Sequence, residues 1–215
     1  MVQLFYVKCD EDISNTRFYN YLNELPSKFH NNILKYKNRG DALLTLFGKL
    51  LLGTAIKANN LDLSLDDISY SLFGRPFFFG SDIDFNISHS SEYVVCALSL
   101  TQKIGVDIEK ILSINFADFD TSFSTEEWSG INSSGNPLRT FYHYWTAKEA
   151  VIKADGRGLS IEPKSVLIFK DLATISNQRW YLMSIDIDKD YVLHLASPNN
   201  LFGQISIQEV CFDFS

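Results

Sequence analysis

Apolar and polar residues alternate along several short segments of the chain, which is the pattern of β-strands with one buried face. Gly74 and Pro76 interrupt one of these segments with a turn. The segments that this pattern predicts to be strands lie at 3–8, 67–78, 83–88, 93–100, 103–109, about 165–170, 179–187, 191–197 and 204–213.

Other segments repeat their apolar residues every three or four positions, as amphipathic helices do. The predicted helices lie around 15–35, from Asp41 to about Lys57, from near Ser124 onward, and from about Leu138 to Ala154. Asn38 offers a side-chain cap for the second of these helices, and Gly156 is placed to end the last one.

The order strand, helix, helix, strands occurs twice along the chain, with a midpoint near residue 100. We therefore predict an α+β protein of two related halves, at 1–101 and 102–215. Residue-level similarity between the halves is too weak to establish an internal repeat.

The composition is typical of an ordinary globular protein. Of 215 residues, 46% are hydrophobic and 14% are aromatic, which is ample for a core. Its apolar runs fall short of the ~20 residues that a membrane helix needs, and the first residues lack the features of a signal peptide. We therefore expect a cytoplasmic protein, with Cys9, Cys96 and Cys211 as reduced core thiols.

The net charge of −7 argues against non-specific binding to nucleic acid, whose phosphates favour a basic surface. The charge is uneven, because residues 1–60 carry eight Lys and Arg against five Asp and Glu, whereas residues 61–215 carry eleven against twenty-one. A local basic cluster before the second predicted helix contains Lys28, Lys35, Lys37 and Arg39. This cluster could receive an anionic ligand or partner, or it could form an ordinary solvated face.

Two acidic residues stand close together in the stretch GVDIEK, at 105–110. In a strand, Asp107 and Glu109 project from one face while their apolar neighbours project from the other. Two like charges about 4 Å apart, at an effective dielectric near 20, repel by roughly 4 kcal/mol. A buried pair therefore needs a partner, which could be a cation, a basic side chain or water.

A second charged motif lies in WTAKEAVIKADGRGL, at 145–159. On a helix, Glu149 and Lys153 share a face and could form an i,i+4 ion pair worth about a few tenths of a kcal/mol. The rest of this helix is unusually apolar, which favours an interface for its charged residues over a solvated surface.

Three signals occur in a set order: GRP followed by FNISHS (85–90), then GVDIE (105–109), then WTAKEAVIKADGRGL. With them the chain resembles the Sfp-type 4′-phosphopantetheinyl transferases over roughly residues 35–165. The resemblance implies two similar α/β halves in a pseudo-twofold arrangement, with the active site in the cleft between them. It also implies a Mg²⁺-dependent enzyme that moves the 4′-phosphopantetheine arm of coenzyme A to a serine of an apo acyl, peptidyl or aryl carrier protein, releasing adenosine 3′,5′-bisphosphate.

By position in these motifs, the resemblance implies that Asp107, Glu109 and Glu149 hold the metal ion. Three converging carboxylates would repel one another by on the order of 12 kcal/mol, against a whole-protein stability of about 5–15 kcal/mol. Such a site would be hard to retain without a cation. Lys153 matches the family's second helical lysine and could help to neutralise the negative charge that develops on the leaving phosphate.

Glu127, in the stretch FSTEEW, matches the family position of the base that removes the proton of the acceptor serine. The stretch also fits a capping box, in which the Glu127 carboxylate would reach back to the backbone N–H of Ser124. Both interpretations remain open from the sequence. Contacts with coenzyme A are implied for His89, Ser88, Arg75, Thr45, Arg39 and Lys148.

The expected protein partner is an acidic, helical carrier protein. A net negative enzyme would repel it, so local apolar contacts would have to dominate within a Debye length of about 8 Å. The apolar residues of the linker after Glu109 are Ile111, Leu112, Ile114 and Phe116. Two halves in one chain already build the cleft, so we expect a monomer. The pathway served, whether fatty acid, polyketide or nonribosomal peptide synthesis, is left open.

Two other hypotheses remain open from the sequence. The protein could be a Mg²⁺-dependent phosphohydrolase that cleaves nucleotides or coenzyme A without transferring the arm. It could also be a catalytically silent carrier-protein-binding or scaffold protein, in which the acids and lysines form structural ion pairs.

Overall fold

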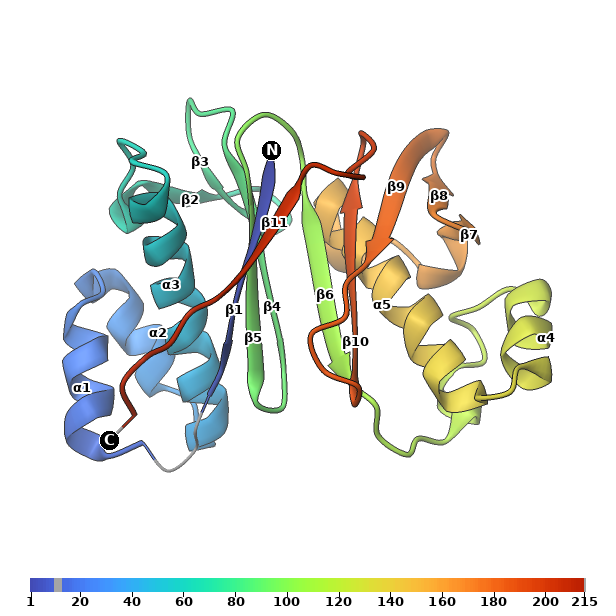
Figure 1. The fold of residues 1–215 in the computed structure, drawn as a ribbon, viewed down its shortest axis with the longest axis horizontal. Helices are drawn as coiled ribbons and strands as arrows, with labels where there is room; N and C mark the ends of the chain where they lie inside the picture. The colour runs from blue at the N-terminus through green and yellow to red at the C-terminus, as the bar shows by residue number, and fades with distance from the viewer. Residues whose placement is uncertain (10–12, 215) are drawn as a thin grey trace.

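The computed structural model describes residues 1–9 and 13–214 and shows two β-sheets side by side at the centre, with helices on their outer sides (Figure 1). The facing sides of the two sheets meet through buried apolar side chains, among them Leu4, Val95, Val106 and Leu195. The order through the molecule is therefore helix, sheet, sheet, helix. The predicted α+β class with two sheet-containing halves is confirmed.

The first half contains a four-stranded sheet, three helices and a small hairpin. Its elements are β1 (Val2–Lys8), α1 (Asn15–Asn23), α2 (His30–Leu34), α3 (Arg39–Ala58), β2 (Ile68–Tyr70), β3 (Pro76–Phe78), β4 (Asp84–Ser90) and β5 (Tyr93–Ser99), with β11 (Ile205–Glu209) at the sheet edge. The strand order is β11-β1-β5-β4, and β2 pairs with β3 separately. Helix α3 begins where the Asn38 side chain accepts a hydrogen bond from the Gly40 N–H at 2.7 Å, which confirms the predicted cap.

The second half contains a five-stranded sheet covered by one long helix. Its elements are β6 (Gly105–Lys110), α4 (Thr125–Ser133), α5 (Pro137–Asp155), β7 (Leu167–Phe169), β8 (Leu172–Ile175), β9 (Gln178–Ser184) and β10 (Tyr191–Ser197), in the sheet order β6-β10-β9-β8-β7. Gly156 ends α5 in the left-handed conformation at φ +92°, as predicted. Short 3₁₀ helices lie at Ser27–Phe29, Leu65–Asp67, Phe116–Phe119, Gly158–Ser160 and Pro163–Ser165.

Strand β6 and helix α5 approach each other closely at Gly105. A Cβ at this position would lie 2.0 Å from the Ala150 carbonyl oxygen and 2.6 Å from the Ala154 backbone nitrogen, so only glycine fits. Asp107 and Glu109 follow at alternate positions of the same strand and project on the side of Gly105. The close contact therefore brings both acidic side chains next to α5.

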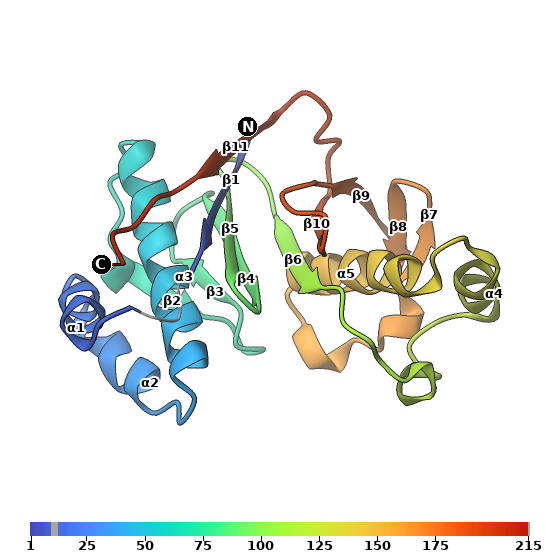
Figure 2. The ribbon, with the colours of Figure 1, turned by 60° about the horizontal axis from the view of Figure 1, so that its bottom comes forward.

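The C-terminal segment returns to the first half of the molecule. Strand β11 pairs in parallel with β1, and Figure 2 shows the chain crossing from the second half to end beside α1 and α3. Beyond the strand, the Phe212 ring lies 4.9 Å from that of Phe47 on α3. The predicted strand at 204–213 thus exists but is shorter, and it joins the sheet of the other half. The division at 1–101 and 102–215 stays a prediction.

Two further expectations differ from the structure. Strand β8 lies between the predicted strands at about 165–170 and 179–187 and was missed, because a four-residue strand shows too few alternations. Cys9 and Cys96 are buried free thiols, but Cys211 is exposed, because it follows β11 on the outside of the sheet, so its prediction as a core thiol was wrong. No helix within the described residues is long and apolar enough to cross a membrane.

Candidate active site

A cavity of about 320 Å³ gathers side chains from both halves of the chain. Strand β4 supplies one wall, and β6 with α5 supplies the other. The lining residues are Ile87, Ser88, His89, Asp107, Glu109, Trp145, Glu149 and Lys153. The structure therefore brings together six of the residues that the family resemblance singled out, although they lie up to 65 positions apart in the sequence.

Asp107 is the most buried acid of the cavity, with 4% of its surface exposed. Its Oδ1 lies 2.6 Å from Lys153 Nζ and accepts a hydrogen bond from Ser88 Oγ at 2.9 Å. Within the described residues, its other oxygen, Oδ2, has no hydrogen-bond partner. A basic side chain is thus the partner that the paired acids of β6 required, but it satisfies only one oxygen of one acid.

The other two carboxylates of the cavity hold their protons more tightly than usual. Burial, followed by the neighbouring charge of Asp107, raises the pKa of Glu109 to about 7, although Ser90 donates a hydrogen bond to it at 2.7 Å. The same two causes, in the same order, raise the pKa of Glu149. The cavity therefore carries more potential negative charge than the single Lys153 compensates.

The donor chemistry of the cavity fits a divalent cation. Carboxylates from two elements line one space, a buried carboxylate oxygen lacks a partner among the described residues, and two carboxyl pKa values are raised. Such hard oxygen ligands suit Mg²⁺, which binds one or two carboxylates alongside substrate phosphates. No group of three or more His, Cys, Asp or Glu among the described residues is yet arranged to hold a metal ion, so the predicted ligand set of Asp107, Glu109 and Glu149 remains a prediction.

A ladder of side-chain hydrogen bonds joins β4 to β6, although the two strands belong to different sheets. Each accepting side chain stands two residues after the previous one, and each donor is a backbone N–H 20 residues further along the chain. The bonds run from Ile104 N to Asp84 Oδ2 (2.8 Å), Val106 N to Asn86 Oδ1 (2.9 Å), Ile108 N to Ser88 Oγ (3.4 Å) and Lys110 N to Ser90 Oγ (3.0 Å). The ladder satisfies the free edge of β6 and holds the two walls of the cavity in register.

Ser88 and His89 therefore have different surroundings, although they are adjacent in the sequence. Ser88 is buried, and its hydroxyl binds Asp107, Lys153 and the ladder at once. His89 is exposed at the cavity. Partial loss of solvent around its ring, followed by the charge of Lys153, lowers its pKa. Both residues line the cavity, but only His89 is exposed there, and their assignment to coenzyme A stays a prediction.

Thr45 and Arg39 lie outside the cavity lining. The Thr45 hydroxyl donates to the Asp41 carbonyl of its own helix at 2.9 Å. Arg39 donates to Asn15 Oδ1 at 2.5 Å and to the Ile13 carbonyl at 2.8 Å, beside α1. Both residues have local partners that account for them, so their assignment to coenzyme A stays a prediction from the family pattern.

Glu127 and Lys148 form a separate, closed pair. Glu127 Oε2 accepts from the Ser124 N–H at 2.8 Å and the Glu127 N–H donates to Ser124 Oγ at 3.2 Å, which completes the capping box. Lys148 has no exposed surface and lies 2.9 Å from Glu127 Oε1. Neither residue lines the cavity, so the roles of Lys148 as a contact for coenzyme A and of Glu127 as a base stay predictions from the family pattern.

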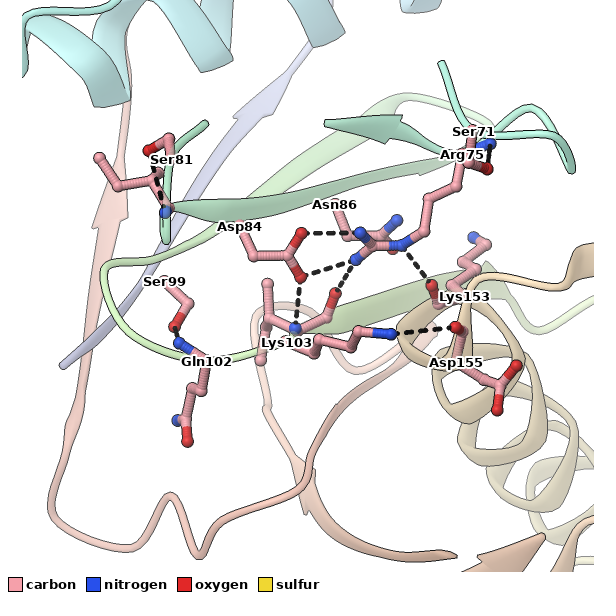
Figure 3. Close-up of polar contacts among 12 residues, drawn as sticks. Ser71, Arg75, Ser81, Asp84, Asn86, Ser99, Gln102, Lys103, Lys153 and Asp155 are labelled. Atoms are coloured by element: carbon pink, nitrogen blue, oxygen red, sulfur yellow. Dashed lines mark hydrogen bonds and ion pairs between the residues drawn. The ribbon is translucent and has the colours of Figure 1, made fainter. Parts of the chain in front are cut away.

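Arg75 is also engaged within the protein. Its guanidinium makes a bidentate pair with Asp84, with both distances at 2.7 Å (Figure 3). Asp84, Asn86 and Ser90 were not singled out from the sequence as functional residues. Their signal was present in DFNISHS, where polar residues occupy every second position of a strand, on the face opposite its buried apolar residues.

Comparisons with known proteins agree with these motifs. A sequence model described as the 4′-phosphopantetheinyl transferase superfamily matches residues 103–199, and one described as 4′-phosphopantetheinyl transferase, N-terminal, matches residues 12–101. The 4′-phosphopantetheinyl transferase gsp of Aneurinibacillus migulanus is 34% identical over 80% of this chain and 73% of its own length. The 4′-phosphopantetheinyl transferase Sfp of Bacillus subtilis (strain 168) is 30% identical over 88% of each chain.

Proposed function

Because the chain belongs to the 4′-phosphopantetheinyl transferase superfamily, we propose that it transfers the 4′-phosphopantetheine arm of coenzyme A to a serine hydroxyl of an apo carrier protein. One observation of the structure supports this proposal most directly. Three carboxylates and a lysine, from β6 and α5, share one cavity that opens between the two halves.

The proposed reaction exchanges one P–O bond for another. The serine oxygen forms a bond to the phosphorus that carries the pantetheine arm, and the bond from that phosphorus to the bridging pyrophosphate oxygen breaks. Adenosine 3′,5′-bisphosphate leaves with the bonding electron pair, and the serine proton passes to a base. The protein has to position the two reactants and stabilise the charge on the leaving oxygen.

Asp107, Glu109 and Glu149 are the residues that would hold Mg²⁺. When bound, the ion neutralises charge on the pyrophosphate and on the leaving oxygen. Lys153 contributes a second positive charge from the same face of the cavity, where its Nζ already lies beside Asp107. In this proposal the Glu149 carboxylate, which lines the cavity from α5, would accept the serine proton, directly or through a water molecule.

The two substrates are assigned to different sides of the molecule. The exposed His89 and the net positive charge of residues 1–60 would favour the phosphates of coenzyme A on the side of the first half. On the other side, the linker after β6 leaves Leu112 53% exposed, while Ile111, Ile114 and Phe116 pack on the cluster around Phe141. We propose that Leu112 contacts the carrier protein.

The decisive experiment is to incubate the protein with coenzyme A, Mg²⁺ and several apo carrier proteins, and to follow the intact mass of each carrier. We expect a gain of one phosphopantetheine arm that is abolished by EDTA and by Asp107→Asn, and unchanged by Asp118→Asn, a control at an exposed acid of the same half. Cleavage of coenzyme A without any carrier modification would indicate hydrolysis instead. No gain on any carrier would contradict the proposed transfer.

A further inference from the structure

Arg75 lies in the turn between β2 and β3, and this turn holds it firmly. The Ser71 N–H donates to the Arg75 carbonyl at 2.9 Å, and the Arg75 N–H donates back to Ser71 Oγ at 3.1 Å. Gly74, at φ +79°, supplies the left-handed residue that the turn needs. The turn therefore aims the Arg75 side chain away from its own hairpin, toward the second half (Figure 3).

The Arg75 guanidinium contacts three elements at once. Nη1 and Nη2 donate to the two oxygens of Asp84 on β4. Nη2 also donates to the Ile104 carbonyl just before β6, at 3.0 Å, and Nε donates to the Lys153 carbonyl in the last turn of α5, at 2.9 Å. Asp84 in turn accepts from the Ile104 N–H at 2.8 Å. A single arginine thus joins β4, the start of β6 and the end of α5 (Figure 3).

Arg75 and Asp84 line a second cavity, of about 540 Å³, but they present little of their surface to it. The Arg75 side chain is 13% exposed and that of Asp84 is 12% exposed, so the pair is largely withdrawn from solvent. A bidentate arginine–carboxylate pair compensates both charges and fixes the plane of the guanidinium. The anionic partner that the family pattern suggested for Arg75 is therefore replaced by a carboxylate of the protein itself.

Arg75 contacts the end of α5 close to the residues that line the cavity. The carbonyl that Arg75 binds belongs to Lys153, whose Nζ lies 2.6 Å from Asp107, and Glu149 stands one turn earlier on the same helix. Gly156 follows at φ +92°, where a Cβ would lie 2.7 Å from Arg75 Cδ. The arginine side chain thus packs directly under the end of the helix that carries both cavity residues.

We propose that Arg75 and Asp84 are a positioning pair, which sets the end of α5 against β4 and β6 so that Lys153 and Glu149 face Asp107 across the cavity. The pair acts on the rate of the reaction through these residues and does not touch coenzyme A. This inference rests on the proposed transferase function for its kinetic consequence, but its structural consequence can be measured without any substrate.

The kinetic test compares Asp84→Asn and Arg75→Lys with the double variant. Lysine at position 75 cannot make the bidentate pair, and asparagine at position 84 removes the negative charge of the carboxylate. We expect kcat to fall by about tenfold in each single variant, because small displacements of positioned groups slow catalysis strongly, with the KM for coenzyme A changed by less than about threefold. The double variant should fall no further than the slower single variant, since the two residues act as one unit.

Lys103→Gln is the matched control. Lys103 is an exposed cation in the same region, and its Nζ lies 3.5 Å from the Asp155 carbonyl at the end of α5. Losing it should leave both kinetic parameters within about twofold of those of the unmodified protein, because an exposed side chain contributes little. A fall in kcat equal to that of Arg75→Lys would mean that the effect is not specific to the pair, and would overturn the assignment.

The substrate-free test is hydrogen exchange of the peptide that spans 150–157. We expect its amides to exchange about tenfold faster in Asp84→Asn and Arg75→Lys than in the unmodified protein, because the last turn of α5 opens locally. Unchanged exchange in folded variants would overturn the proposal, and Arg75→Lys decides if Asp84→Asn fails to fold. A tenfold higher KM for coenzyme A in Arg75→Lys, with Asp84→Asn normal, would also overturn it in favour of direct binding. A lack of transferase activity in the unmodified protein would contradict the proposed function only, since exchange still tests the pair.

Discussion

Helix α5 carries two lysine–carboxylate pairs, and the two regions differ in how completely they are closed. Lys148 lies 2.9 Å from Glu127 and donates to the carbonyls of Pro163 and Val166 at 3.1 and 2.6 Å, with none of its surface exposed. The Lys153 side chain is 28% exposed, and its partner Asp107 keeps one oxygen without a partner among the described residues. Both oxygens of Glu127 face a partner, Oε1 in the ion pair with Lys148 and Oε2 at the Ser124 N–H, whereas Asp107 can accept a further ligand at Oδ2.

The comparison shows that residue type and spacing do not separate a structural pair from a functional one. Both lysines lie in the same stretch, KEAVIK, and both face an acid from another element. What differs is the surroundings, because the closed pair is sealed by the 3₁₀ turn at 163–165 and by the Phe123 ring, 5.5 Å from Lys148 Nζ. The open pair borders a cavity. Variants of the two pairs should accordingly separate stability from activity.

The largest expected effect is on stability, at the closed pair. Lys148→Met would leave the Glu127 carboxylate buried without its cation, so the free energy of unfolding should fall by about 3–5 kcal/mol. Urea denaturation measures the change. Adding Glu127→Gln to this variant should recover much of the loss, because it removes the unpaired charge. If Lys148→Met were as stable as the unmodified protein, the closed pair would have no structural role.

At the open pair, the main effect should be on activity. Lys153→Met removes a positive charge from the cavity, so the rate of transfer to a carrier protein should fall by about 100-fold. Stability should fall by less than it does at Lys148, because the Lys153 side chain is 28% exposed and Asp107 keeps the hydrogen bond from Ser88. Single-turnover kinetics and urea denaturation of one preparation test both statements. Lys164→Met, at an exposed lysine of the same half, serves as the control. Equal losses of stability at Lys153 and Lys148 would remove the distinction between the pairs.

A buried histidine, His194, should make the stability of the folded protein depend on pH. His194 on β10 stands opposite Asp107 in the strand register, but its ring is buried under α5, with Nδ1 2.7 Å from Thr146 Oγ1. Burial, followed by the neighbouring His143, lowers the pKa of His194 from 6.5 to about 3. The unfolded chain therefore binds a proton in this range that the folded protein does not, and stability falls as the pH drops from 6.5 toward 3.

The expected slope from this group approaches about 1.4 kcal/mol per pH unit, or about 2 kcal/mol between pH 6.5 and 5. Urea denaturation at several pH values, compared with His194→Gln, isolates the contribution. The variant should lose less stability than the unmodified protein on acidification. Parallel pH profiles for the two proteins would show that the buried imidazole is not the titrating group.

The smallest effect concerns binding of the metal ion at the open pair. Mg²⁺ at ten times its Kd should stabilise the folded protein by about 1.4 kcal/mol, because it binds the folded state alone. Thermal unfolding with and without Mg²⁺ measures this shift. Asp107→Asn should abolish it, whereas Glu127→Gln should leave it unchanged. A shift of the same size in both variants would place the ion elsewhere.

Local patterns predicted most of the elements and part of the site. The helix cap at Asn38, the end of α5 at Gly156 and the shared face of Asp107 and Glu109 depend on neighbouring residues alone, and the structure shows all three. Ser88 was assigned to coenzyme A, yet it belongs to a ladder whose donors lie 20 residues away. A sequence pattern cannot show which backbone edge a polar strand face will meet.

The sequence by itself determined the fold class, the family and the set of acids and lysines from which a site could be built, because periodicity and motif spacing are properties of short segments. The tertiary structure alone decided which lysine is sealed and which is open, that Arg75 binds Asp84, and that the last strand returns to β1. These depend on contacts between segments far apart in the chain, where burial and available partners set the role of each charge.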